Sequence, residues 1–421
     1  MSSMKIKVLY ILFALPLLWW SCSKDFGTTE VTYNKAIAIY EDLNEIRNTP
    51  LVEGLREISD PGKVFVSDEF LLIGEERKGI HVLDNSDPTH PAHVSFLNVP
   101  GNKEFFVADG FIYAESYYDM IKIDISDINS PKITGRVENY FESTQLNGQG
   151  DAVIGFRYEI VTEEVEDDDQ SIWNSIYNYD EVLYDYNRSV IPHSAVPASF
   201  AGSSNKAIGS VNRITKAKGH VYAVNNERIS VISDNNLRLI KSFYIASRME
   251  TIYPTSDYLF IGGTNSVEIF SIVDPSDPFH AGSFWHPTSC DPVYPLEDVA
   301  YLTLRTGDED CPGDINSLVT LDISNVSASS IVQQIEMESP YGLTLINDKL
   351  YVGEGEYGLK IFDATDRYNL HLLKYDSSLP AYDIIQHPSR SDIVLIAGPQ
   401  GFGQYDVNGD DEFSLLSWIA Y

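Results

Sequence analysis

Residues 81–88 read His-Val-Leu-Asp-Asn-Ser-Asp-Pro, an apolar strand that runs into a turn led by an aspartate. Related phrases return along the 421 residues, and most of them lie about 40 residues apart. The aligned positions are Asp84, Asp124, Ser233, Ser271, Asp322, Asp363 and Asp406. A strand-rich repeat of this length is typical of a β-propeller blade, so the sequence predicts an all-β fold.

The first copy shows why each repeat should form a four-stranded sheet. Residues 64–66 suit a short inner strand, and the apolar run 70–73 suits burial between neighbouring sheets. Residues 79–83 can pair beside that run, and the more polar residues 94–97 can form the outer strand. Because one such sheet cannot cover its own faces, we expect the sheets to stack into a single closed ring.

Residues 51–421 are therefore predicted to form one closed propeller of seven blades, interrupted by an insertion at about 140–205. The interval from Asp124 to Ser233 is much longer than the others and requires this insertion. An eighth blade, begun by a hairpin over residues 150–165, is the alternative. The acid run at 163–169 is interpreted as a solvated loop, with a Ca²⁺ site as the alternative.

Residues 1–21 have the pattern of an export signal. After two lysines, residues 8–20 form an apolar run that is too short to span a bilayer, which takes about 20 residues. Ser21 and Cys22 then resemble the lipobox of bacterial lipoproteins, which implies acylation at Cys22 and a membrane partner held through acyl chains. An ordinary signal peptide or an uncleaved anchor are the alternatives.

Residues 22–50 are predicted to form a tether and a short helix. Ser23-Lys24-Asp25 resembles the signal that sends lipoproteins of Bacteroidota to the cell surface. We therefore expect an outer-membrane lipoprotein, with the cell surface favoured over the periplasmic face. The apolar spacing over residues 31–46 fits an amphipathic helix.

The net charge and the number of cysteines indicate which partners and which cross-links to expect. The formal net charge of −33 opposes binding to nucleic acid. Cys290 and Cys311 remain in the exported part, and an even pair in such a chain favours a disulfide. A metal site at these two cysteines is the alternative.

Several phrases resemble the LVIVD-repeat lipoproteins of Bacteroidota. They are residues 78–88, 100–102, 289–293 and 300–307. The resemblance implies a propeller and an exported lipoprotein, and it brings no established activity. Ser233 and Ser271 depart from it, since both stand where the usual phrase has an acid.

No catalytic motif, metal site or cofactor is expected. The chain has neither the HExxH nor the Gly-x-Ser-x-Gly pattern. Asp406, Asn408 and Asp410 fit half of a Ca²⁺ loop, but Asp411 and Ser417 stand where that loop needs Gly and Glu. We interpret this stretch as a plain turn.

The repeat also predicts a binding site at the central mouth of the ring, where each inner strand begins. Aligned by repeat, the polar residues there are Lys63, Lys103, Glu104, Arg213, Glu250, Asp291, Tyr341, Tyr382 and Asp383. A non-catalytic binding or scaffold module, with outer-membrane proteins or lipoproteins as partners, is the favoured function. The alternatives are a glycan-active enzyme that uses Glu250, Asp291 and Asp383, and a glycan binder that stacks sugars on Tyr341, Tyr382 and Trp285.

Overall fold

The computed structural model describes residues 28–140, 147, 150–166, 213–225, 228–245, 249–287, 292–306, 315–407 and 412–421. The chain divides into two compact units, one of residues 1–37 and 158–182, the other of residues 38–157 and 183–421. Cys22, Cys290 and Cys311 lie outside the described residues, as does most of the predicted insertion at 140–205, of which residues 140, 147 and 150–166 are described.

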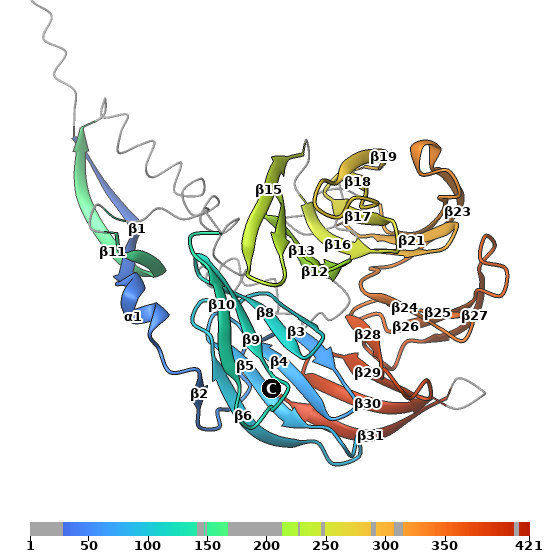
Figure 1. Cartoon of the computed structure of the whole chain (residues 1–421), viewed down its shortest axis with the longest axis horizontal. Helices are drawn as coiled ribbons and strands as arrows, with labels where there is room; N and C mark the ends of the chain where they lie inside the picture. Colours follow the sequence, from blue (N-terminus) through green and yellow to red (C-terminus); the bar gives the residue numbers. More distant parts are fainter. Residues whose placement is uncertain are drawn as a thin grey trace, which may run out of the picture. The chain divides into compact units, whose positions relative to one another are not determined.

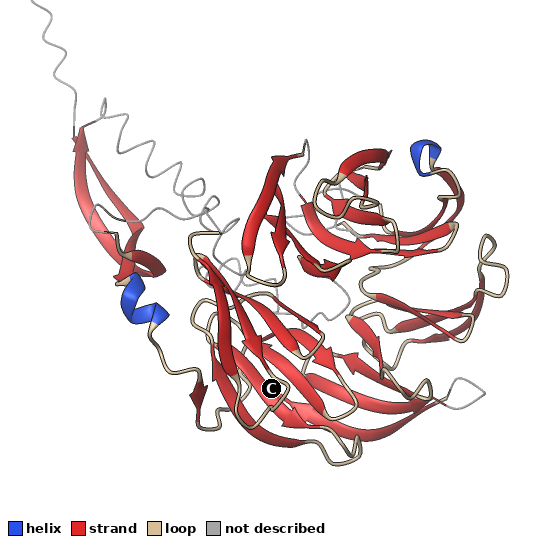
Figure 2. Cartoon of the chain, in the orientation of Figure 1, coloured by secondary structure: helices blue, strands red, loops and turns tan. Residues whose placement is uncertain are grey.

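The larger unit contains seven blades of four strands each in a propeller arrangement, and the first blade gains one further edge strand (Figures 1 and 2). From the inner to the outer strand, the first three blades are β3 (Pro61–Val66), β4 (Phe70–Glu75), β5 (Gly79–Asp84) and β6 (Ala92–Asn98); β7 (Phe105–Ala108), β8 (Phe111–Ser116), β9 (Asp119–Asp124) and β10 (Lys132–Val137); and β12 (Ile214–Ala217), β13 (His220–Asn225), β14 (Arg228–Ser233) and β15 (Arg238–Tyr244).

The remaining four blades follow the same order. They are β16 (Met249–Pro254), β17 (Tyr258–Gly263), β18 (Ser266–Ser271) and β19 (Phe279–Trp285); β20 (Val293–Leu296), β21 (Val299–Leu304), β22 (Ser317–Asp322) and β23 (Ser330–Glu336); β24 (Leu343–Ile346), β25 (Lys349–Gly353), β26 (Leu359–Asp363) and β27 (His371–Asp376); and β28 (Asp383–Gln386), β29 (Ile393–Ala397), β30 (Gly401–Val407) and β31 (Phe413–Ala420). A single turn of 3-10 helix, η2 (Val326–Ala328), follows β22.

Most of the apolar core of the described residues lies between the blades, where seven of its nine clusters each join two neighbouring sheets. Leu72 and Ile80 of the first blade pack on Ile112 of the second, for example, and all three are fully buried. Each such side chain contributes about 1.5–3 kcal/mol by leaving water. This confirms that the blades bury their faces against one another.

The first and last blades are in direct contact, which we call the seam. Val64 and Leu71 share a buried cluster with Leu395 and Phe402. Beside this cluster, Gln404 Nε2 donates to Asn85 Oδ1 at 2.7 Å and Ser417 Oγ donates to the Pro88 carbonyl at 2.7 Å. Within the described residues neither of these two blades contains a strand of the other, so side chains, and not an exchanged strand, join them.

The aspartate-led turns form as predicted. Asp84 Oδ1 accepts the Ser86 N–H at 2.9 Å, and the aspartates at 124, 322 and 363 make the same bond two residues on. In the copy that has Ser271, the serine Oγ accepts the Val273 N–H at 3.4 Å, and Asp274 Oδ1 accepts the Ser276 N–H at 3.0 Å, as Asp87 Oδ1 accepts the Thr89 N–H in the first blade. The predicted Ca²⁺ alternative at 406–410 is not tested, because Asn408 and Asp410 lie outside the described residues.

The predicted amphipathic helix over residues 31–46 is wrong. Residues Thr28–Glu41 form a strand, β1, which pairs with β11 (Ala152–Glu166), and a single turn, α1 (Leu43–Arg47), follows. A distant partner strand therefore overrides the local 3.6-residue pattern. Among the described residues no helix is long and apolar enough to cross a membrane.

The eight-blade alternative is also wrong for the residues that the structure describes. β11 does not fold into a hairpin that seeds a blade; it pairs with β1 in a separate two-stranded sheet. β2 (Val52–Glu53) instead adds a fifth strand to the outer edge of the first blade, where it pairs with Leu97 and Phe96 of β6.

Asp234 clamps the second blade to the third. Its carboxylate accepts hydrogen bonds from Lys122 of β9, at 2.6 Å, and from Lys216 and Tyr113. Burial alone would raise the pKa of Asp234, but these three donors outweigh it and lower the pKa to about 2. The clamp thus holds an ionised carboxylate between two blades.

Candidate functional site

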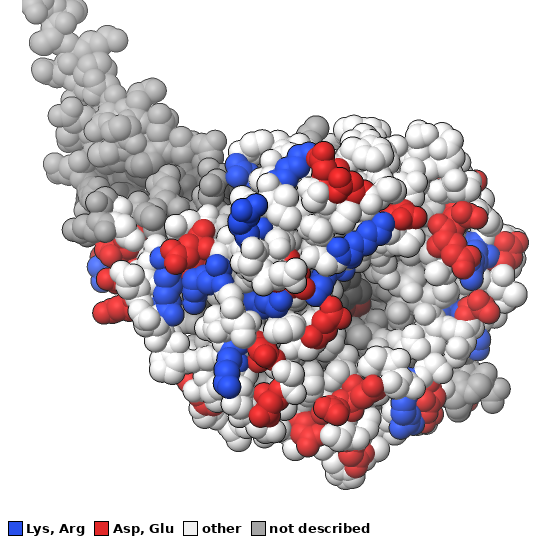
Figure 3. All heavy atoms as spheres, in the orientation of Figure 1, with Lys and Arg blue, Asp and Glu red and all other residues white. Residues whose placement is uncertain are grey.

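The candidate site is a cluster of charged side chains where the first three blades meet at the central mouth; we call it the mouth cluster. Figure 3 shows Lys and Arg side chains next to Asp and Glu side chains beside a hollow on the face drawn. The cluster members in the described residues are Lys63, Glu76, Arg77, Lys103, Glu104, Glu115 and Arg213.

The linker between β6 and β7 carries two of these side chains into the mouth. The buried Asn102 amide donates to the carbonyls of Glu104 and Glu115, both at 3.0 Å. The Arg77 N–H donates to the Asn102 carbonyl at 2.6 Å, which ties the β4–β5 turn to the same linker. The side chain and the carbonyl of Asn102 therefore hold the linker in place beside Lys103 and Glu104.

Lys63 and Glu104 form the inner part of the cluster. Lys63 Nζ lies 3.9 Å from Glu104 Oε1, and both side chains are nearly buried. Burial lowers the pKa of Lys63, opposed by the charges of Glu104 and Asp383, and burial raises the pKa of Glu104. Two opposite charges thus share a poorly solvated space.

Glu76, Lys103 and Glu115 form the outer part, and all three titrate near neutrality. Burial raises the pKa of each glutamate to about 7 and lowers the pKa of Lys103 to about 7, while the opposite charges among them work against these shifts. Groups that are shifted in this way gather at functional sites more often than elsewhere.

Two carboxylate oxygens in the cluster have no hydrogen-bond partner among the described residues. They are Oε1 of Glu76 and Oε1 of Glu104, and both are buried. A buried acceptor without a partner costs about 1–3 kcal/mol. The mouth cluster can therefore accept hydrogen bonds from a bound group.

The predicted mouth residues are only partly brought together. Lys63, Lys103, Glu104 and Arg213 lie in the cluster, and Asp383 contributes its charge at Lys63. Glu76 and Glu115 were missed, because they stand at the ends of second strands and not at the start of inner strands. Their only sequence signal is an acid at the end of an apolar strand.

Tyr341 and Tyr382 form a separate aromatic pair near the last two blades. Their rings pack edge to face at 5.1 Å, and the Arg305 guanidinium lies 4.4 Å from the Tyr341 ring centre. Tyr382 is only 1% exposed, so it does not offer a stacking surface for a sugar. Trp285 is exposed but lies on the outer strand β19, away from the inner strands.

The last two predicted residues cannot be assessed at the mouth. Glu250 lies in β16, at the predicted start of an inner strand, but its side chain is outside what the structure describes. Asp291 lies outside the described residues. Among the described residues, no three His, Cys, Asp or Glu side chains are placed to hold a metal ion.

Two segments, residues 60–98 and 313–336, match the LVIVD repeat. The chain carries LVIVD repeats. The first match spans the whole first blade, and the second covers β22 and β23. None of the curated proteins compared with the chain matches it.

One solved structure shares the fold of this LVIVD-repeat chain at low identity. A protein of unknown function from Desulfotomaculum acetoxidans DSM 771 is 12% identical with a TM-score of 0.53, and the match covers 84% of this chain and 95% of that one. The Neurospora crassa Pan2 WD40 domain (9% identity, TM-score 0.49, 81% and 86% covered) and BamB from Moraxella catarrhalis (9%, 0.48, 93% and 99%) are less similar. We draw only the propeller fold from the first.

Proposed function

We propose that this chain is an exported, lipid-anchored propeller that serves as a non-catalytic binding or scaffold module at the outer membrane, on the cell surface. The mouth cluster is its binding site. The observation that carries the proposal is the pair of buried carboxylate oxygens, on Glu76 and Glu104, that lack hydrogen-bond partners among the described residues.

The chemistry of the cluster defines the partner group. Glu76 Oε1 and Glu104 Oε1 lack hydrogen bonds, although Glu104 Oε1 is ion-paired with Lys63, so both can accept them, and charge-assisted bonds from Lys or Arg donors are the strongest of these. The net charge of −33 favours a basic partner over long distances as well. The partner is therefore a protein that presents a basic side chain to the mouth, either an outer-membrane protein or another lipoprotein.

The test is cross-linking on intact cells, followed by identification of the attached protein and titration of the purified pair. The variant Glu76→Gln/Glu104→Gln keeps the shape of both side chains and should weaken binding at least about tenfold. The control Glu69→Gln/Glu356→Gln changes two exposed glutamates and should leave affinity unchanged. Equal affinity for both variants would refute the mouth as the binding site.

Lipid anchoring has its own test, which depends on Cys22. A Cys22→Ser variant should leave the membrane fraction and appear in soluble form, because the acylated thiol is gone. External protease should digest the wild-type protein on intact cells. A wild-type protein that is protected until the outer membrane is permeabilised would instead place it on the periplasmic face.

A glycan-active enzyme is the second candidate, and one observation favours it. Glu76 and Glu115 have pKa values raised to about 7, which suits general acid or base chemistry at neutral pH. Turnover on a panel of polysaccharides that is lost in Glu115→Gln would support an enzyme. Absence of product across the panel supports the binding module.

A further inference from the structure

The outer strands of the seven blades differ in how their edges are protected. The edge of an outermost strand invites pairing with another chain, and proteins often protect such an edge with charged residues. Four of the outer strands, β10, β15, β23 and β27, contain Lys, Arg, Asp or Glu. The other three, β6, β19 and β31, contain none of these residues.

The chain itself covers one of the three uncharged edges. β2 pairs antiparallel with β6, and Val52 lies opposite Leu97. The Asn98 N–H donates to the Leu51 carbonyl at 2.6 Å, which extends this pairing by one backbone bond. The outer edge of a blade in this molecule therefore accepts a further antiparallel strand, and the segment that it accepts is short and extended.

β31 is the longest of the three uncharged strands, and within the described part of the chain it pairs with β30 alone. The Tyr421 N–H donates to the Gln400 carbonyl at 3.3 Å, and Ala420 lies opposite Gly401. Opposed residues of an antiparallel ladder alternate between bonded and non-bonded pairs. The N–H and C=O groups of Trp418 and Ala420 therefore point away from β30, towards the outer edge.

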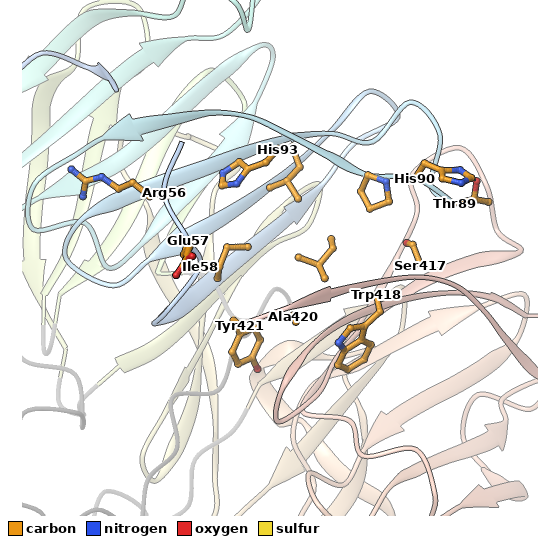
Figure 4. Close-up of a pocket in the computed structure, with 13 residues that line it drawn as sticks. Arg56, Glu57, Ile58, Thr89, His90, His93, Ser417, Trp418, Ala420 and Tyr421 are labelled. Carbon is orange, nitrogen blue, oxygen red and sulfur yellow. The ribbon is translucent and has the colours of Figure 1, made fainter. Parts of the chain in front are cut away.

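A cavity of about 750 Å³, which we call the seam cavity, lies between β31 and the first blade. Ser417, Ile419 and Tyr421 line it and alternate along β31, so they share one face of the strand. Figure 4 shows the Trp418 ring on the other face of β31, away from the seam cavity. Because Ala420 also lines the seam cavity, that cavity adjoins the edge at which the backbone groups point outward.

The lining of the seam cavity suits uncharged apolar side chains. Ile58, Leu83 and Pro91 line it from the side of the first blade. Its two charged lining residues, Arg56 and Glu57, have opposite signs. Since a charge is costly to take out of water without a partner, an apolar side chain fits this space better than an ion does.

We infer that the outer edge of β31 is a docking site for an extended, uncharged segment of a partner protein, which adds to the seventh blade as a fifth strand. Backbone hydrogen bonds to Trp418 and Ala420 hold the segment, and its alternate apolar side chains enter the seam cavity beside Ile419. In this mode of recognition, main-chain bonds give affinity and pockets for alternate side chains give specificity.

The charge of the molecule argues for a different protein as the partner. Two copies of this chain, each with a formal net charge of −33, repel each other. The pairing of β2 with β6 shows that an extended segment fits such an edge, and the absence of charge along β31 calls for an uncharged one. The inference does not depend on the mouth cluster.

The test is a fluorescence anisotropy titration of the purified full chain, kept in detergent, with a labelled heptapeptide. The peptide Thr-Val-Thr-Leu-Thr-Val-Thr is uncharged and places its apolar residues on one face of a strand. It should bind with a Kd below about 1 mM. Lysine in place of the central leucine should weaken binding about tenfold, because it brings a charge to the seam cavity.

Two variants at one position test the backbone contact. Ala420→Pro removes an outward N–H, and proline is tolerated on an edge strand, so binding should weaken at least about tenfold. Ala420→Ser keeps that N–H and should bind like the wild type. Hydrogen exchange adds a readout without a variant: the peptide should protect the amides of Trp418 and Ala420, and it should leave β19 unchanged. This readout decides the matter if Ala420→Pro does not fold.

Four results would overturn the inference. They are no binding of the heptapeptide up to about 1 mM, equal affinity of Ala420→Pro and Ala420→Ser, equal protection of β19 and β31, and a dimer of the chain that Ala420→Pro dissociates. The last result would assign the edge to a second copy. Glu76→Gln/Glu104→Gln should bind the peptide normally, so failure at the mouth and failure at this edge can be told apart.

Discussion

Gly101 shapes the linker that carries Lys103 and Glu104 into the mouth. Its φ is +77°, and a Cβ atom there would lie 2.3 Å from the Tyr117 ring. Gly110 also has a positive φ, +78°, but the nearest atom to its Cβ position is 3.9 Å away. The two glycines thus share a backbone conformation and differ in the space around it.

Substituting alanine at Gly110 and Gly101 separates the cost of backbone strain from the cost of a steric clash with Tyr117. Gly110→Ala should lower the free energy of unfolding by about 1 kcal/mol through backbone strain alone. Gly101→Ala should lower it by about 3 kcal/mol, because the ring of Tyr117 must also move. Urea denaturation of both variants measures the difference. Equal losses would mean that Tyr117 does not restrict the linker.

Some residues of the mouth cluster could be predicted from the sequence and others could not. Lys63, Glu104 and Arg213 could be placed from the sequence, because the repeat fixes where each inner strand begins. Glu76 and Glu115 could not, because their burial depends on how neighbouring blades approach one another.

Among the elements, β1 shows the limit of local pattern. Apolar residues such as Ile37 and Tyr40 fit a helix by spacing, yet the segment is a strand because β11, more than 100 residues on, pairs with it. The blade strands were predictable because alternation, aspartate-led turns and the 40-residue period agree with one another. The long-range pairing of β1 with β11 could not be predicted from the sequence.

The Asp234 clamp between the second and third blades gives a prediction about how two elements are held together. Asp234→Ala should cost about 3 kcal/mol of unfolding free energy, because it leaves Lys122 partly buried without its carboxylate and leaves Lys216 with Asp109 alone. Asp257→Ala, which breaks an exposed pair with Lys218, should cost less than about 1 kcal/mol. Thermal unfolding of both variants checks this, and similar losses would contradict the clamp.

Acid should weaken the clamp in a defined range of pH. The pKa of Asp234 is lowered to about 2 in the fold, so its contribution is complete above its unfolded value near 4. As the pH falls from 4 towards 2, that contribution is lost. The difference in stability between wild type and Asp234→Ala should therefore shrink over this range, and a constant difference would contradict the assignment.

At the scale of the whole molecule, the seam is one of seven contacts between neighbouring blades. Its contribution to stability can be compared with that of another such contact. Gln404→Leu leaves Asn85 without its partner and should cost about 2 kcal/mol. Hydrogen exchange should rise first in β4 and β30. Gln333 bridges the fifth and sixth blades in the same way, through Leu370, so Gln333→Leu should raise exchange there and spare the seam. If hydrogen exchange rises in the same strands in both variants, the two contacts do not act locally between their own pairs of blades.

Because the seam is made by side chains of the first and last blades, it cannot exist until β31 has left the ribosome. Six blades can stack as they are synthesised, but Val64 and Leu71 stay uncovered until the seventh arrives. A nascent chain that stalls before that point exposes the apolar face of its first blade. Chaperones bind such exposed apolar surface.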